Sequence, residues 1–232
     1  MLTCPRTAAL LLLSAITLPV SADLAKGLNA AAAQKWTEAL REFKPMAEQG
    51  DANAEVNVGN LYLRGLGVEQ DYTKAYDWFD KAARQGNVAG QTKLGLMHYY
   101  GLGIKEDHAA AAEWFLKAAE QGDPEAALVL GELYNRGDGV TRHPVEAYLW
   151  YSVAADLGKE DANDQRIRLL DELSPADINI ALTRLNVWRE QHHSMARGAS
   201  RIQPELGTTP ERGKTGRSVK QTPSHRPLAK PK

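Results

Sequence analysis

Cysteine is almost absent from this chain. Its 232 residues include one cysteine, Cys4, which precedes an apolar run near the N-terminus. A disulfide or a cysteine-ligated metal site needs at least a second cysteine. We therefore expect the chain after the apolar run to contain no thiol, no disulfide and no cysteine-bound metal.

Long apolar runs are also missing. The longest, residues 8–16, has about half of the roughly 20 residues that a membrane span needs. It follows Arg6 and is followed by the small residues of Val20-Ser21-Ala22, a pattern typical of a cleaved secretory signal. We predict a signal peptide over residues 1–22 and a periplasmic or secreted protein with no transmembrane segment after cleavage. An uncleaved anchor is the alternative.

Positive charge is scarce until the end of the chain. Residues 23–196 contain 18 Lys and Arg against 27 Asp and Glu, whereas residues 197–232 contain 9 against 2. This last segment has five prolines and no aromatic residue, so it cannot bury enough apolar surface to fold. We predict a basic disordered tail over residues 195–232, which could attract an anionic envelope component. Nucleic acid is not an expected partner, because export and the lack of interleaved aromatic residues argue against it.

What the chain has in abundance is a repeat. Residues 51–158 align without a gap as three copies of 36 residues, a period that indicates a stacked array. Each copy is predicted to form two helices around a glycine loop, with Asp71, Asp107 and Asp123 as N-terminal caps. Apolar residues recur at helical spacing, and the repeated tryptophans are predicted to lie in the core. Columns shared by the three copies include Gly59/Gly95/Gly131, Ala75/Ala111/Ala147 and Trp78/Trp114/Trp150.

The repeat has a recognisable pattern. Residues 51–158 contain the pattern Leu-Gly-x-x-Tyr-x-x-Gly-x-Gly-Val followed by Ala-x-x-Trp-(Phe/Tyr)-x-x-Ala-Ala-x-x-Gly. This pattern resembles the Sel-one-like repeat family, relatives of the tetratricopeptide repeats. The resemblance implies an all-α, right-handed α/α superhelical solenoid of antiparallel helix pairs, about ten helices in all, and an adaptor role. Some secreted relatives are described as β-lactamase-like, but they have paired cysteines, which this chain lacks.

Both ends of the array are predicted to be caps. Residues 23–50 are expected to form a helix pair, with Pro45 kinking or shortening its second helix. Residues 159–194 are expected to supply two closing helices, the last opened by Ser174 as its cap and ending near Gln191. A polar outer surface is expected there, because the open end of an array needs one to stay soluble.

No catalytic or metal-binding constellation stands out. The glycine loops lie between helices and not after a strand, so they do not indicate a nucleotide site. His98 stands in a column of tyrosines and is predicted to pack, while His192 and His193 are expected to meet terminal helix carbonyls. We predict no catalytic residues, no cofactor, no metal and no enzymatic activity. An envelope enzyme of the β-lactamase-like or cell-wall-active kind is the open alternative.

The positions that vary between copies point to a binding surface. In this architecture the first helix of each repeat is expected to line the concave face. Leu96, Tyr100 and Val129 place apolar side chains where other copies have polar ones, a pattern typical of an interaction hot spot. We predict an exported scaffold or regulatory adaptor that binds a partner's peptide or helix, anchored by Leu96 and Tyr100; a secreted host-interaction factor is a second alternative. The predicted contact residues are Asn57, Asn60, Arg64, Lys93, Leu96, Tyr100, Val129, Glu132 and Arg136.

Overall fold

The computed structural model describes residues 22–199, and all regular secondary structure in that range is helical, which confirms the predicted all-α class. The predicted signal peptide, except for Ala22, and the predicted tail from residue 200 onward lie outside the described residues. The elements in chain order are α1 (Ala22–Ala32), α2 (Trp36–Glu48), α3 (Ala52–Arg64), α4 (Tyr72–Arg84), α5 (Val88–Tyr100), α6 (His108–Glu120), α7 (Pro124–Arg136), α8 (Pro144–Asp156), α9 (Glu160–Arg168), the 3₁₀ turn η1 (Leu169–Asp171) and α10 (Pro175–Ala199).

The repeat helices begin at the predicted caps. The side chains of Asp71 and Asp107 each accept a hydrogen bond of 2.9 Å from a backbone amide in the first turn of α4 and α6. Asp123 accepts the equivalent bond in α7 at 2.7 Å. Each bond satisfies an amide that a helix start leaves without an intrahelical partner. All three capping predictions are confirmed.

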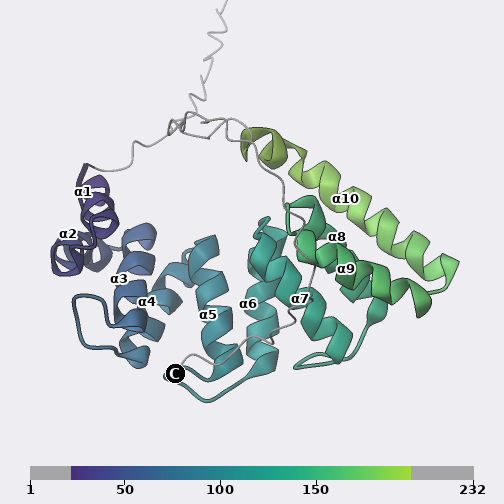
Figure 1. The fold of residues 1–232 in the computed structure, drawn as a ribbon, viewed down its shortest axis with the longest axis horizontal. Helices are drawn as coiled ribbons and strands as arrows, with labels where there is room; N and C mark the ends of the chain where they lie inside the picture. Colours follow the sequence, from purple (N-terminus) through teal and green to yellow (C-terminus); the bar gives the residue numbers. More distant parts are fainter. Residues whose placement is uncertain (1–21, 200–232) are drawn as a thin grey trace, which may run out of the picture.

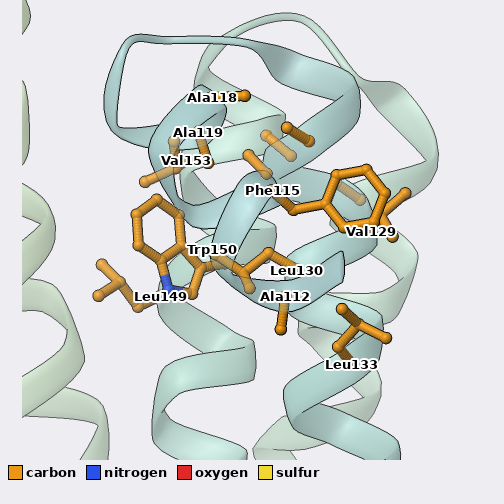
Figure 2. Close-up of a cluster of buried hydrophobic side chains, with 14 of the residues drawn as sticks. Ala112, Phe115, Ala118, Ala119, Val129, Leu130, Leu133, Leu149, Trp150 and Val153 are labelled. Atoms are coloured by element: carbon orange, nitrogen blue, oxygen red, sulfur yellow. The ribbon is translucent and has the colours of Figure 1, made fainter. Parts of the chain in front are cut away.

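The two helices of each repeat meet at a glycine. The rings of Phe115 and Tyr151, at most 1% exposed, lie against Gly95 and Gly131. A Cβ atom added at Gly131 would lie 2.7 Å from the Tyr151 ring, closer than side-chain carbons approach one another. Glycine therefore sets how deeply the ring packs. Figure 2 shows Phe115 in a cluster to which α6, α7 and α8 contribute.

The repeats stack in chain order. Each helix from α1 to α8 packs against the next one, and the helix pairs follow one another along a curve (Figure 1). Polar side chains also join the two helices of a repeat at equivalent positions. The Gln85 amide donates to the Glu55 carboxylate at 2.7 Å, and the Gln121 amide donates to the Gln91 side-chain oxygen at 2.7 Å. The structure is thus the predicted solenoid of helix pairs.

Pro45 does not shorten α2, so the shortening that was expected as one of its two possible effects is wrong. α2 spans 13 residues, as α3 to α8 do. Pro45 lies in the last turn, where it removes a single backbone donor. Phe43 and Ala47, on either side of it, are 1% and 2% exposed. Their burial against the core holds the last turn in helical form.

Only one of the three repeat tryptophans is fully part of the core. Trp150 is 6% exposed, whereas Trp78 and Trp114 are half-buried. The Lys81 and Lys117 ammonium groups lie 4.0 and 3.9 Å from the ring centroids of Trp78 and Trp114, as cation–π pairs. The predicted burial in the core is therefore complete only for Trp150. The difference arises because α10 packs over α8, which carries Trp150.

The closing helices α9 and α10 do not form a further repeat. Both pack against α8, but they make no extensive contact with each other. Ile167 of α9 stands 36 residues after Gly131, at the position where the repeats have glycine. α9 thus lacks the small residue that lets a second-helix ring approach. α10 continues to Ala199, beyond the predicted end near Gln191 and into the segment predicted to be tail.

The surface of these closing elements is mixed, because exposed apolar side chains stand among its many exposed polar ones. Of the six large apolar side chains that are exposed in the described residues, five belong to the closing elements, and the sixth, Leu28, belongs to α1. They are exposed because α9 and α10 do not cover each other. The five are Ile167, Leu170, Ile180, Leu182 and Val187.

Candidate functional site

The nine predicted contact residues all lie on the first helices of the three repeats. α3 also packs against α5, the contact expected of helices on the inner side of a curved array (Figure 1). Arg64 and Arg136 are exposed. Val129 is buried. The other six are half-buried: Asn57, Asn60, Lys93, Leu96, Tyr100 and Glu132.

Val129 does not belong to the exposed surface. Its side chain is 5% exposed and lies in the same core cluster as Phe115 and Leu130 (Figure 2). α7 packs against both α6 and α8, so more of its surface is buried than the comparison of repeat positions predicted. Val129 therefore supports the surface from beneath and offers little area to a partner.

Leu96 and Tyr100 are held in place by their neighbours. Leu96 packs against the cluster that contains Val129. The Tyr100 ring meets the Tyr99 ring edge-on, with centroids 5.0 Å apart and an interplanar angle of 85°. Burial raises the pKa of the Tyr100 hydroxyl, and the charges of Tyr99 and Glu132 add to the rise. Both side chains therefore keep part of their surface accessible in a fixed position.

Glu132 is a half-buried carboxylate beside this pair. Burial raises the pKa of Glu132, while the nearby Arg136 guanidinium acts in the opposite direction. Tyr151 lies close by in the core, and burial, followed by the charge of Glu132, raises the pKa of Tyr151 to about 12. Within the part of the chain that the structure describes, the Glu132 carboxylate has no hydrogen bond or ion pair.

One histidine, His108, forms an ion pair between repeats. His108 Nδ1 contacts the Asp138 carboxylate, and His108 Nε2 lies 3.1 Å from the Glu106 carboxylate. The His108 ring also stacks on Tyr99, with centroids 4.6 Å apart. Burial by itself would lower the pKa of His108, but the hydrogen bond and charge of Asp138 raise it above its usual value. This pair joins the second and third repeats.

We expect the His108–Asp138 pair to make stability depend on pH. Because the pKa of His108 is raised in the folded state, its stabilising effect is complete below the unfolded pKa of about 6.5 and is lost as pH rises through the folded value. His108→Tyr introduces the residue found at this position in the first repeat, Tyr72. The melting temperature of the native chain minus that of the variant should decrease between pH 6 and pH 8. A difference that stays constant or increases contradicts the assignment.

The other two histidine predictions concern packing. The His98 ring meets Tyr76 edge-on at 5.6 Å between centroids, which confirms its packing role, and burial lowers its pKa. His192 Nε2 lies 2.6 Å from the Glu120 carbonyl oxygen, a terminal carbonyl as predicted, but of α6 and not of its own helix. The side chain of His193 lies outside the described residues. In the described range, no group of three or more His, Asp or Glu side chains could hold a metal ion.

A second surface, which the sequence analysis missed, lies where α10 crosses α8. A hollow of about 460 Å³ opens between α6, α8 and α10 and is lined by Leu149, Trp150, Val153 and Trp188, among others. Leu149 and Val153 stand where the first two repeats have an acidic residue and a lysine. This loss of charge on a second helix is the sequence signal of the hollow, which a comparison of first helices alone does not contain.

The geometry of these helix pairs can be compared with known proteins. The family model of the Sel1 repeat matches residues 52–87, 88–123 and 124–159. Residues 52–159 are three Sel1 repeats. The matched repeats coincide, within one residue, with the copies identified in the sequence. Sel1-repeat solenoids are commonly protein-interaction scaffolds and are typically not catalytic.

Two solved structures share the Sel1-repeat fold with this chain. A Sel1 repeat protein from Oxalobacter formigenes is 34% identical over 62% of this chain, with a TM-score of 0.60. A protective antigen of uropathogenic Escherichia coli strains, described as having an SLR fold, is 34% identical over 75% of this chain, with a TM-score of 0.63. This chain covers 59% of the first protein and 38% of the second. The comparison with curated proteins found no match.

None of the described helices is both long enough and apolar enough to span a membrane.

Proposed function

We propose that this Sel1-repeat protein is an interaction scaffold or adaptor that binds a peptide or helix of a partner protein on the inner surface of its first helices. The observation that carries the proposal is the pair Leu96 and Tyr100. At the position of Leu96 the neighbouring repeats have Asn60 and Glu132, and at the position of Tyr100 they have arginines. A half-buried apolar pair among polar columns is the kind of surface that supplies most of the energy of an interface.

The packing of this pair supports the proposal. Leu96 rests on a buried cluster, and Tyr100 is braced by Tyr99. Side chains that are already fixed lose little conformational entropy on binding. Arg64 and Arg136 are exposed in the flanking repeats and supply a charged rim. A partner would thus find an apolar centre with charges around it, the usual anatomy of a protein interface.

The proposal is tested by crosslinking and affinity capture from an envelope extract, followed by mass spectrometry. We expect a specific protein to be captured by the native chain and lost with Leu96→Glu/Tyr100→Glu. Burying two new carboxylates in the contact would weaken binding by at least about a hundredfold, because each leaves a charge unpaired at the interface. Capture of the same proteins by both forms would contradict the proposal.

Two further variants separate lost binding from lost folding. Arg64→Glu changes only an exposed position on the same face and should reduce capture without affecting the melting temperature. Lys105→Glu, in the exposed loop between α5 and α6, is the matched charge control and should capture the partner normally. If the control loses the partner as well, net charge and not the inner surface determines binding.

The cellular location belongs to the same proposal. The apolar segment near the N-terminus supports export, and we place the protein in the periplasm or outside the cell. The Escherichia coli structure is that of a protective antigen, which favours a host-facing secreted factor as the second candidate. Cell fractionation distinguishes the two, because a periplasmic adaptor is released by osmotic shock and a secreted factor is found in the medium. No side-chain arrangement in the described residues favours the enzymatic alternative.

A further inference from the structure

Glu132 is exceptional among the carboxylates that lie between helices. Most of these already have a partner within the chain, for example Glu125 with Lys159 and Asp156 with Arg189. Glu132 is half-buried on α7 and has neither a hydrogen bond nor an ion pair in the described range. A carboxylate that is partly removed from water without a partner lowers stability, so such groups are normally paired. Its position therefore suggests that the partner charge comes from another molecule.

The surroundings of Glu132 suit a cation. Tyr100 of α5 interacts electrostatically with Glu132 and presents an aromatic ring, which attracts cations as well as apolar groups. Arg136, one turn further along α7, is exposed, and its charge lowers the pKa of Glu132 although the two side chains form no close ion pair. Its long side chain can move away into solvent. An incoming guanidinium or ammonium group would thus meet a carboxylate and the Tyr100 ring together.

We infer that the inner surface selects partner segments in which a basic residue pairs with Glu132 while an apolar residue packs on Leu96. This inference rests on the proposed function and specifies the chemistry of its partner. The two contacts hold different parts of the segment. The apolar contact provides affinity, and the charge pair fixes register, because a misplaced segment would leave Glu132 buried without a partner.

The repeat sets the spacing of the two partner residues. Leu96 and Glu132 occupy the same column of adjacent repeats, on α5 and α7. The equivalent first helices α3 and α5 are in contact, and packed helices lie about 8–10 Å apart, which is the spacing we take for α5 and α7. An extended segment advances about 3.3 Å per residue, so the basic residue should lie about three residues from the apolar one. In a helical partner, with a rise of about 1.5 Å per residue, the separation becomes about six.

The test uses a random dodecamer peptide library selected on the native chain, followed by affinity measurements with the synthesised peptides. We expect enriched peptides to contain Arg or Lys at one of these two spacings from an apolar residue. Glu132→Gln should weaken their binding by about tenfold to a hundredfold, the usual effect of losing a charged hydrogen-bonding partner. Glu113→Gln, an exposed glutamate on α6, is the matched control and should bind as the native chain does.

The outcomes separate this inference from the proposed function. Peptides that lose binding with Leu96→Glu/Tyr100→Glu but contain no basic residue, or bind Glu132→Gln unchanged, overturn the inference and leave the proposed function standing. Peptides that bind all variants equally, or no enrichment at all, overturn both. Glu132→Lys provides a second readout, because it should shift selection towards acidic residues. Melting temperatures close to that of the native chain verify that each variant is folded.

Discussion

Phe115→Ala is expected to lower the free energy of unfolding by about 3–5 kcal/mol, the usual range for removing a fully buried phenylalanine. The Phe115 ring is 0% exposed and lies in the cluster shared by α6, α7 and α8 (Figure 2). It packs against Gly95, which has no side chain that could fill the space left by the ring. In a domain of this size the melting temperature should fall by roughly 6–20 °C. Thermal and urea unfolding followed by circular dichroism measure the change.

Phe115→Leu is the matched control. Leucine retains much of the apolar volume, so the loss should be clearly smaller than with alanine. If the two variants unfold at the same temperature, volume at this position does not determine stability, and the packing of the ring on Gly95 is not as the structure has it.

Gly103→Ala is expected to lower the free energy of unfolding by about 2–5 kcal/mol through two separate effects. Gly103 has a φ of 72°, a left-handed conformation that costs an alanine roughly 1–2 kcal/mol. A Cβ atom there would also lie 2.6 Å from the carbonyl carbon of Tyr72, which belongs to the backbone and cannot rotate away. The loop after α5 would have to separate from the start of α4. Chemical unfolding measures the loss.

Gly86→Ala isolates the contribution of the close approach. Gly86 also has a positive φ, 84°, but a Cβ atom there would have no other atom within 4 Å. Only the conformational cost of roughly 1–2 kcal/mol should remain. The difference between the two variants therefore reports the contact between the loop and the neighbouring repeat. Equal losses would show that this contact is loose.

Local signals in the sequence predicted the repeat unit well. The caps at Asp71, Asp107 and Asp123 depend on neighbouring backbone amides, so their role follows from a few residues of sequence. The 36-residue period fixed the helix boundaries because the same signals recur three times. The shortening expected from Pro45 was wrong for the opposite reason. The rule that proline ends or shortens a helix takes account of one helix alone. Here the burial of Phe43 and Ala47 against other helices keeps α2 at full length.

The candidate site was predicted only in outline. Comparing repeat columns placed all nine residues on the first helices, which the structure confirms. The columns did not reveal that Val129 is buried, because burial depends on how closely α6 and α8 enclose α7. They also did not distinguish Glu132 from the other acidic residues. Its lack of a partner depends on which side chains come near it from other helices, and spacing along one helix does not contain that information.

By itself the sequence determined the helix pairs, their period, the caps and the columns of small residues, because these depend on contacts that recur within 36 residues. The tertiary structure decided the rest. α10 docks on α8 through contacts between residues more than 30 positions apart, such as Arg189 with Asp156. That docking buries Trp150 and leaves apolar side chains exposed on the closing helices. Such contacts follow no period, so only the folded chain shows which surfaces they cover and which they leave for a partner.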